Sequence, residues 1–344
     1  MILPMRFKTL LALSFIILLP GCGSSAQKEH LISGRTMGTT YHIKVVAPSL
    51  EDMAGLQVKI DQRLEQINQS MSTFRPDSEI SRFNALTAIK TPFKVSPDFL
   101  RVMLSAREIY HLTAGAWDGT VNPLVNLWGF GHSGPLKHLP PEEAVKKALG
   151  EVGFDQIVVD PTGTLSKAHP HVSVDLASIA KGYGVDQVAV LLHNNGYKNF
   201  LVEIGGEVYA AGKRHDDKPW HVGINQPKRD APLDAVYRVV TLRNAAMATS
   251  GDYRNFYQLQ GHAFSHIIDP RTGHPIQNGV VSASVVADNC TLADGLATAL
   301  MVMGPVQGLA LLNQLEGIEG LVVVRKPDGK LENFPSAGLL GLAR

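Results

Sequence analysis

Apolar residues recur at helical spacing in several parts of the chain, most clearly between residues 53 and 71. In that segment they fall every three or four positions, at Met53, Leu56, Ile60, Leu64, Ile67 and Met71. This spacing puts them on one face of an amphipathic helix, and Ser49 and Asp52 precede it as a capping pair. Further helices are predicted from Ser96-Pro97 to just before Gly115, from Pro141 onwards, and over residues 178–194 and 292–303.

Strand-like segments are concentrated in the second half of the chain, where apolar runs alternate with turn residues. The predicted strands occupy residues 39–46, two segments within 156–175, and 200–210, 221–224, 235–242, 256–268, 280–287 and 321–335. Short turns between successive strands favour antiparallel hairpins, and helices do not alternate regularly with strands. The pattern therefore predicts an α+β fold with mixed, largely antiparallel sheets and flanking helices, in a single two-lobed domain over residues 31–344.

The first 22 residues have the pattern of an export signal. Arg6 and Lys8 precede an apolar run over residues 10–19, which is too short to span a bilayer comfortably. The run ends in Leu-Pro-Gly-Cys, which resembles a bacterial lipobox with Cys22 as the lipidated residue; an ordinary signal peptide with an incidental cysteine is the alternative. We expect residues 23–30 to form a tether, and the protein to be lipid-anchored to the bacterial cell membrane on its periplasmic side.

Composition narrows the classes of function. The formal net charge is +1 and only 18% of residues are charged, which gives no electrostatic case for nucleic-acid binding. The chain has two cysteines, so if Cys22 carries lipid, Cys290 has no disulfide partner and the core must stabilise the exported protein. Removal of the signal leaves about 320 residues, enough for one large or two closely associated domains.

The strongest candidate chemistry lies in the last third of the chain. Asp294 and Thr298 are four residues apart and share one face of a predicted helix, which suits Mg²⁺ carrying a polyphosphate; a capping Asp and a Thr bonded back to its own helix are the alternative. His266 could move a proton at neutral pH or serve as a structural histidine. Arg271 could pair with a phosphate or with a surface carboxylate, and together these residues suggest phosphoryl or nucleotidyl transfer.

A second candidate region runs from a strand end into a helix over residues 174–184. The free N–H groups of a helix N-terminus form a natural phosphate site, which Asp175 and Lys181 could complete. Gly182 and Gly184 lie inside that helix and lack the rest of a dinucleotide fingerprint. The Gly205-Gly206 pair predicts a bulge or a close approach by another segment of backbone or a ligand. Trp117 and Phe74 could stack on a flat ring or pack in the core.

Eight ordered sequence blocks resemble the ApbE family, the FAD:protein FMN transferases, over essentially all of the mature chain. They are Gly34–Tyr41, Met71–Phe74 with Asp77–Asn84, Ala116–Asp118 with Val121–Leu124, Asp175–Gly184, Glu203–Glu207, Ala248–Tyr253, Ser265–Gly273 and Asp294–Thr298. The resemblance implies an exported, often lipidated, Mg²⁺-dependent enzyme. Such enzymes split FAD, join FMN to a Thr or Ser of a target protein and release AMP. Their targets are subunits of membrane redox complexes such as the sodium-pumping NADH:quinone reductase.

The resemblance also assigns expected roles to individual positions. The FAD-pocket positions match Met37, Phe74, Ala116, Trp117, Asp118, Asp175, Lys181 and Ile268. The positions around the metal match Ser178, Asp294, Ala297 and Thr298, and His266 matches the histidine that takes the acceptor proton. The chain departs from some members at Ala297, where they have a carboxylate, so any metal contact there must come from a backbone carbonyl. That leaves Asp294 as the one strong anionic ligand.

Two other functions are compatible with the same residues. With water as the nucleophile, the site would act as an FAD pyrophosphatase that yields FMN and AMP. A lipoprotein that only holds flavin is the second alternative, although a simple binder would need neither His266 nor the Asp294 and Thr298 pair.

Overall fold

The computed structural model describes residues 27–131, 134, 136–228, 230–232, 235–252, 256–259 and 262–342. The predicted signal peptide with Cys22 lies outside these ranges, as does Tyr253. The described fold begins earlier than expected, because strand β1 (Lys28–Thr36) includes the last residues of the segment assigned to the tether. β1 pairs along its whole length with β2 (Thr39–Ala47) across the two-residue turn Met37-Gly38.

An eight-stranded antiparallel sheet forms the centre of the molecule and confirms the predicted fold class. Its strands follow the order β1, β2, β6 (Phe200–Ile204), β7 (Glu207–Ala211), β10 (Ala245–Gly251), β13 (Val280–Ala287), β14 (Glu319–Arg325) and β15 (Leu331–Pro335). Every neighbouring pair is antiparallel. Successive side chains in a strand point to opposite faces, so the buried runs of these strands must be covered on both sides.

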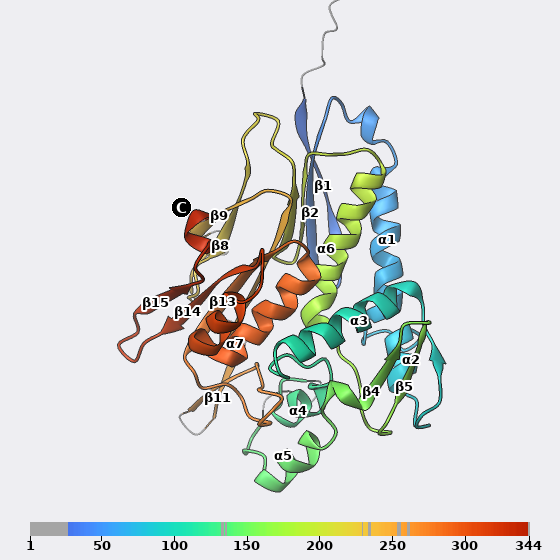
Figure 1. Cartoon of the computed structure of the whole chain (residues 1–344), viewed down its shortest axis with the longest axis vertical. Coiled ribbons are helices and arrows are strands. Elements are labelled where there is room, and N and C mark those ends of the chain that lie inside the picture. Colours follow the sequence, from blue (N-terminus) through green and yellow to red (C-terminus); the bar gives the residue numbers. More distant parts are fainter. Residues whose placement is uncertain are drawn as a thin grey trace, which may run out of the picture.

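Helices cover one face of the sheet (Figure 1). α1 (Leu56–Met71) and α6 (Ala177–Asn194) lie side by side over β2, β6 and β7, and α7 (Cys290–Leu312) packs on β10, β13 and β14. The other face is covered by the hairpin of β8 (Trp220–Asn225) and β9 (Val236–Leu242), together with the short 3₁₀ helix η3 (Leu339–Gly341). The sheet is therefore the middle layer of the larger lobe.

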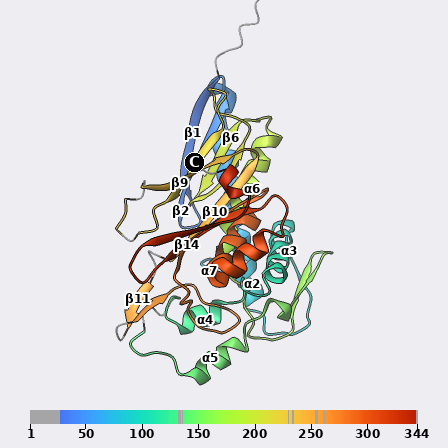
Figure 2. The ribbon, with the colours of Figure 1, turned by 60° about the vertical axis from the view of Figure 1, so that its left-hand side comes forward.

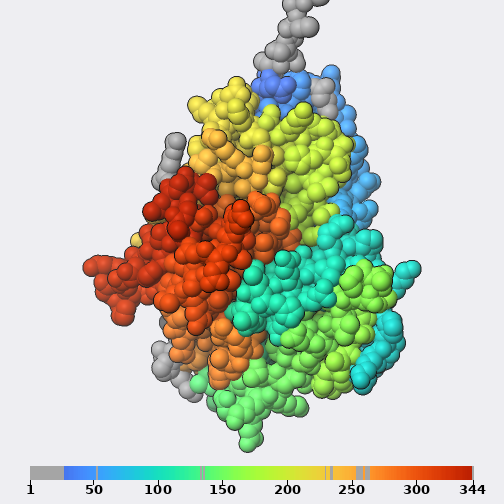
Figure 3. Space-filling view, in the orientation of Figure 1, coloured from blue at the N-terminus to red at the C-terminus, as the bar shows by residue number. Residues whose placement is uncertain are grey.

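α7 is the core helix of this lobe. By length and composition it is the one helix in the described part of the chain that could cross a membrane, but most of its residues are buried among the sheet and α6. It bends at Gly304, whose φ of 73° is not helical, immediately before Pro305. In Figure 3 the segments of α3 and α7 lie against each other on the helical face, below the segment of α6.

The second lobe lies at one end of the sheet and is built mainly from the middle of the chain (Figure 2). α3 (Pro97–Leu112) packs against a small sheet of β3 (Phe93–Lys94), β5 (Thr164–Lys167) and β4 (Ile157–Asp160). The remaining elements are η1 (Glu51–Met53) before α1, and α2 (Glu79–Asn84), α4 (Asn122–Leu127), α5 (Glu142–Leu149), η2 (Phe154–Gln156), β11 (Phe256–Leu259) and β12 (His262–Ser265).

The predicted helices are found, with one wrong start. Ser96 caps α3 by accepting a hydrogen bond from the Phe99 N–H, as its hydroxyl and the following proline predicted. α1 instead begins after Gly55, and no described side chain caps it, so the pairing of Ser49 with Asp52 as its cap was wrong. The apolar spacing began too early because Met53 belongs to η1.

The strand predictions differ from the structure at several places. Residues 200–210 form two strands, because Gly205 and Gly206 both adopt positive φ and reverse the chain rather than forming a bulge. The second strand of 156–175 ends at Lys167, and the strand expected to reach Ile268 ends at Ser265. β10 was not predicted at all.

Candidate active site

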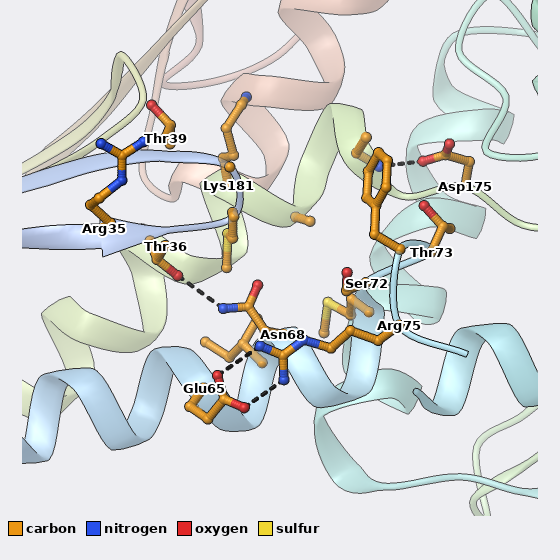
Figure 4. A pocket seen from close by; sticks show the side chains of 17 residues that line it. Arg35, Thr36, Thr39, Glu65, Asn68, Ser72, Thr73, Arg75, Asp175 and Lys181 are labelled. Carbon is orange, nitrogen blue, oxygen red and sulfur yellow. Dashed lines mark hydrogen bonds and ion pairs between the residues drawn. The ribbon is translucent and has the colours of Figure 1, made fainter. Parts of the chain in front are cut away.

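Two adjoining cavities open where the lobes meet, around the N-terminus of α6. The larger holds about 660 Å³ and lies between the β1–β2 turn, the end of α1 and the following loop (Figure 4). The smaller holds about 490 Å³ and lies between the sheet, α7 and the loop after β12. Asp175, Ala177 and Lys181 line both cavities. A ligand that fills both must therefore cross the start of α6.

The larger cavity is lined by four of the residues predicted to bind FAD, and two of them, Met37 and Phe74, line this cavity alone. Met37 lines it from the hairpin turn, where its φ of 49° is unusual for a residue with a side chain. Phe74 lines it from the loop after α1 and is 82% exposed, so its ring is accessible to a ligand. Arg75 also lines it, and its guanidinium forms a two-pronged pair with Glu65, at 2.5 and 2.9 Å.

The start of α6 is held by the residues that precede and face it. Asp175 accepts a hydrogen bond from the Ala177 N–H at 2.8 Å, which fixes the turn into the helix. The Ser178 hydroxyl accepts a hydrogen bond at 2.9 Å from the indole N–H of Trp117, which is 1% exposed. Trp117 thus packs in the core and positions the helix, and it does not offer an open face for stacking.

Lys181, Glu207 and Asp294 form a buried charged cluster in the smaller cavity. The Lys181 ammonium lies 2.9 Å from Glu207 Oε1 and 3.7 Å from Asp294 Oδ2. Asp294 also accepts a hydrogen bond from the Gly182 N–H at 3.1 Å. Glu207 Oε2 is buried and has no hydrogen-bond partner among the described residues. One ammonium therefore serves two carboxylates and leaves one oxygen unsatisfied.

Burial and mutual repulsion shift the pKa values in this cluster. Burial, followed by the nearby Asp294 charge, raises the pKa of Glu207 well above its usual range, although Lys181 opposes the shift. Burial likewise raises the pKa of Asp294, against the opposing effect of Lys181. For Lys181, burial works against the charged form, but the carboxylates of Asp294 and Glu207 outweigh it and raise the pKa. The cluster thus places two carboxyl groups beside one ammonium, and a further cation bound there would lower both carboxyl pKa values.

Hydroxyl groups surround the two carboxylates. The Thr298 hydroxyl lies 3.1 Å from the Ser250 hydroxyl, and Thr249 and Ser284 form a similar contact at 2.8 Å. Asp294 and Thr298 both line the smaller cavity, whereas the helix is capped by Asn289, so Asp294 is not a capping residue. No described group of three His, Cys, Asp or Glu residues could hold a metal by itself. Mg²⁺ usually takes only one or two carboxylates plus water and phosphate oxygens, and the oxygens present here fit that pattern.

His266 also lines the smaller cavity and comes directly after β12. Its ring meets the Phe130 ring edge to face, with 6.3 Å between the ring centres, and Ile268 lines the same cavity. The following turn is rigid, because Arg271 binds Asp269 through two contacts of 2.9 and 2.8 Å. Arg271 is therefore occupied by a carboxylate of its own turn.

The structure brings most of the predicted site residues to the two cavities. The smaller one is lined by Ala116, Trp117, Asp118, Asp175, Ser178, Lys181, His266, Ile268, Asp294 and Thr298. Ala297 of α7 has its side chain in the hydrophobic core, and a metal contact through its backbone carbonyl stays a prediction. Asp118 is committed to the protein, since its carboxylate accepts hydrogen bonds from the Thr120 N–H and hydroxyl and from the Phe154 N–H.

Several cavity residues were missed by the sequence analysis. Glu207, Thr249 and Ser250 come from β7 and β10 and reach the cavity only because those strands are neighbours in the sheet. Glu207 follows the two glycines that were singled out, so a turn at Gly205-Gly206 would have pointed to it.

The fold and the site together define an α+β protein with two adjoining cavities beside a cluster of one lysine and two carboxylates. The ApbE family model matches residues 37–322, and the chain belongs to the ApbE family. The resemblance expected from the eight sequence blocks is thereby confirmed.

Curated relatives and solved structures match nearly the whole chain. An FAD:protein FMN transferase from Vibrio cholerae is 45% identical, over 95% of this chain and 97% of that protein. One from Haemophilus influenzae is 41% identical, over 91% of this chain and 92% of that protein. The solved structure of the flavin transferase ApbE from Vibrio cholerae has a TM-score of 0.82 and 42% identity, over 92% of this chain and 99% of that chain.

Proposed function

We propose that this chain is an FAD:protein FMN transferase that uses Mg²⁺ and joins FMN to a Thr or Ser hydroxyl of another protein. The observation that carries the proposal is the pair of cavities that meet at the N-terminus of α6, next to Lys181 and Asp294. A dinucleotide could occupy both cavities with its pyrophosphate at the helix start, where backbone N–H groups favour phosphate oxygens. The names of the closely similar relatives support flavin transfer.

The side chains of the smaller cavity have distinct proposed tasks. Lys181 and the positive end of α6, beyond the Ala177 N–H that donates to Asp175, hold the pyrophosphate and orient it, and Asp294 and Thr298 hold the cation. A bound Mg²⁺ supplies charge neutralisation for the pyrophosphate and its leaving group. Phosphoryl transfer depends chiefly on such positioning and charge stabilisation, which a cluster on the rigid helices α6 and α7 can provide.

His266 is the proposed base. The acceptor hydroxyl oxygen forms a bond to the FMN phosphorus while the bond from that phosphorus to the bridging oxygen breaks. AMP leaves with the bridging oxygen, and the hydroxyl proton passes to His266. The products are the FMN phosphoester of the acceptor, AMP and one proton, so no water is consumed and no oxidant is needed.

We further propose that the acceptors are exported subunits of membrane redox complexes and that a lipid on Cys22 keeps the enzyme at the periplasmic side of the membrane. The support is the lipobox-like sequence before Cys22. An anchored enzyme and a membrane-bound acceptor share a surface, which raises their encounter frequency.

The deciding experiment incubates the full chain with FAD, Mg²⁺ and an acceptor protein that carries a threonine flavinylation site, followed by intact-mass spectrometry of the acceptor. A mass gain of one FMN group with release of one AMP establishes the transferase. Free FMN and AMP without a gain on any acceptor of a panel would identify a pyrophosphatase instead. Retention of intact FAD would identify a flavin-holding protein.

A further inference from the structure

Glu207 is the buried charged residue of the smaller cavity for which the proposed mechanism has no use. It is the first residue of β7, directly after the Gly205-Gly206 turn, and is only 3% exposed. One carboxylate oxygen, Oε1, contacts the Lys181 ammonium at 2.9 Å. The other, Oε2, is buried without a hydrogen-bond partner among the described residues, although the side chain lines a cavity with polar walls.

A buried carboxylate oxygen without a donor is costly, since burial removes its water and nothing replaces it. The cost is greater here because a second carboxylate, that of Asp294, shares the same lysine. Lys181 cannot satisfy both carboxylates well, as its 3.7 Å separation from Asp294 indicates. The arrangement is therefore better suited to two cations than to one.

The sequence of α7 also favours a role for Glu207 beside a cation. Ala297 is one turn from Asp294, at a position where some family members have a carboxylate, and its side chain lies in the hydrophobic core. α7 thus supplies a single carboxylate, Asp294, to the cavity. A second carboxylate does reach the same place, but from the sheet side.

We propose that Glu207 is a member of the divalent-cation site, with Oε1 holding Lys181 and Oε2 facing the cation directly or through one of its waters. Glu207 thereby supplies from β7 a second carboxylate beside Asp294 of α7. The inference rests on the proposed cation dependence, but not on transfer of flavin to a protein.

The competing explanation is that Glu207 only anchors Lys181. The two explanations predict opposite behaviour for Glu207→Gln, which preserves the size of the side chain and an oxygen that can accept from Lys181. If Glu207 only anchors Lys181, the variant protein should be less stable than the wild type, and its affinity for the divalent cation should be unchanged. A cation ligand would lose affinity, while stability without cation would stay constant or rise, because repulsion between Glu207 and Asp294 is removed.

The test measures Mn²⁺ binding to the full chain by electron paramagnetic resonance, without FAD or acceptor, with Mg²⁺ as the competitor. We expect Glu207→Gln to weaken Mn²⁺ binding about 10- to 100-fold, the usual loss when a group supporting a metal site is changed. Its thermal midpoint in EDTA should be at or above that of the wild type. A Mn²⁺ affinity equal to that of the wild type, whether or not the thermal midpoint falls, would overturn the proposal.

Glu203→Gln is the matched control. Glu203 lies on the same hairpin, but its carboxylate accepts from the Gly206 N–H at 2.7 Å and contacts His42 at 2.7 Å, outside the residues that line the cavity. This variant should bind Mn²⁺ like the wild type. If Glu207→Gln does not fold, Glu207→Asp takes its place, because it keeps the charge on a shorter side chain. The rise in thermal midpoint that Mn²⁺ produces is then compared between this variant and the wild type.

The two proposals can fail separately. Loss of Mn²⁺ binding in Glu207→Gln together with no FMN transfer by the wild type would support the cation site and contradict the transferase. Full transfer by the wild type with unchanged Mn²⁺ binding in Glu207→Gln would support the transferase and contradict the role of Glu207 in the cation site.

Discussion

Asp294 and His266 face the smaller cavity from different elements and have different surroundings. Asp294 is 3% exposed on α7 and is held by a backbone N–H and a lysine, so its position is fixed before any ligand arrives. His266 is half-buried on a loop, where it can meet an incoming group. The first arrangement suits a cation ligand, and the second suits a group that exchanges a proton.

His266→Ala should lower FMN transfer about 10²- to 10⁴-fold, the usual contribution of a positioned base. FAD binding, followed by flavin fluorescence, should stay nearly intact because the ring is one part of the lining of only one of the two cavities. Transfer at the wild-type rate would remove His266 as the base.

Asp294→Ala should reduce activity far more at low Mg²⁺ than at high Mg²⁺, since a weakened site can still be filled by mass action. The measurement is the transfer rate across a Mg²⁺ titration for both proteins. An equal loss at every Mg²⁺ concentration would instead assign Asp294 a purely structural role beside the Gly182 N–H.

At the scale of elements, the site depends on the close contact between α6 and α7. A methyl group on Gly182 would lie 2.4 Å from the Cys290 carbonyl oxygen, which is closer than any normal contact. This explains a glycine within a helix, where it would otherwise be unfavourable. It also lets the Gly182 N–H reach Asp294.

Gly182→Ala should therefore destabilise the protein by up to about 2 kcal/mol, because overpacking costs about 1–3 kcal/mol and the gain in helix propensity is only about 1 kcal/mol. Chemical denaturation measures the change. Gly184→Ala is the matched control: its methyl group would meet the flexible end of Met37 at 3.0 Å, so its stability should be equal or greater. Equal effects of both changes would contradict the tight helix contact.

α7 is also fixed at its beginning by Asp186 of α6, which accepts hydrogen bonds from the Cys290 N–H, the Thr291 N–H and the Thr291 hydroxyl. Burial raises the pKa of Asp186, and these hydrogen bonds only partly oppose the shift. A carboxyl whose pKa is higher in the folded state binds its proton more tightly there. Its contribution to stability is therefore present below its unfolded pKa and falls as the pH rises toward its folded pKa.

The free energy of unfolding of the wild type relative to Asp186→Asn should accordingly decrease as the pH rises from about 4, the ordinary pKa of an aspartate. Urea denaturation of both proteins over a pH series gives this difference and cancels other titrating groups. A difference that increases with pH would show that the hydrogen bonds to the ionised form dominate.

The sequence predicted those elements whose signals, such as caps and short turns, lie within a few residues of one another. The hydroxyl of Ser96 and the following proline located the start of α3, and short turns indicated antiparallel pairing. β10 escaped prediction because its residues, Ala-Ala-Met-Ala-Thr-Ser-Gly, have little preference for strands; small side chains there accommodate α7. Glu207 escaped as a site residue because a non-local sheet pairing brings it beside Asp294.

At the scale of the whole molecule, the described part of the chain is held together without a disulfide. Cys290 is a free, fully buried thiol, and burial raises its pKa well above the usual range, which makes it unreactive. Stability comes instead from the extensive core on both faces of the sheet. This leaves Cys22 as the cysteine available for chemistry.

Labelling of growing cells with an alkyne fatty acid should therefore modify the wild type and not Cys22→Ala. Cys290→Ala removes the other cysteine and should be labelled as fully as the wild type. Label on Cys22→Ala, or none on the wild type, would contradict the anchor.

The wall shared by the two cavities has a further consequence for product inhibition. Asp175, Ala177 and Lys181 line both cavities, so under the proposed function the FMN half and the AMP half of FAD would lie on either side of the start of α6. Each half can then dissociate independently of the other. FMN and AMP would not compete for one place, and a saturating amount of either should leave the affinity for the other almost unchanged.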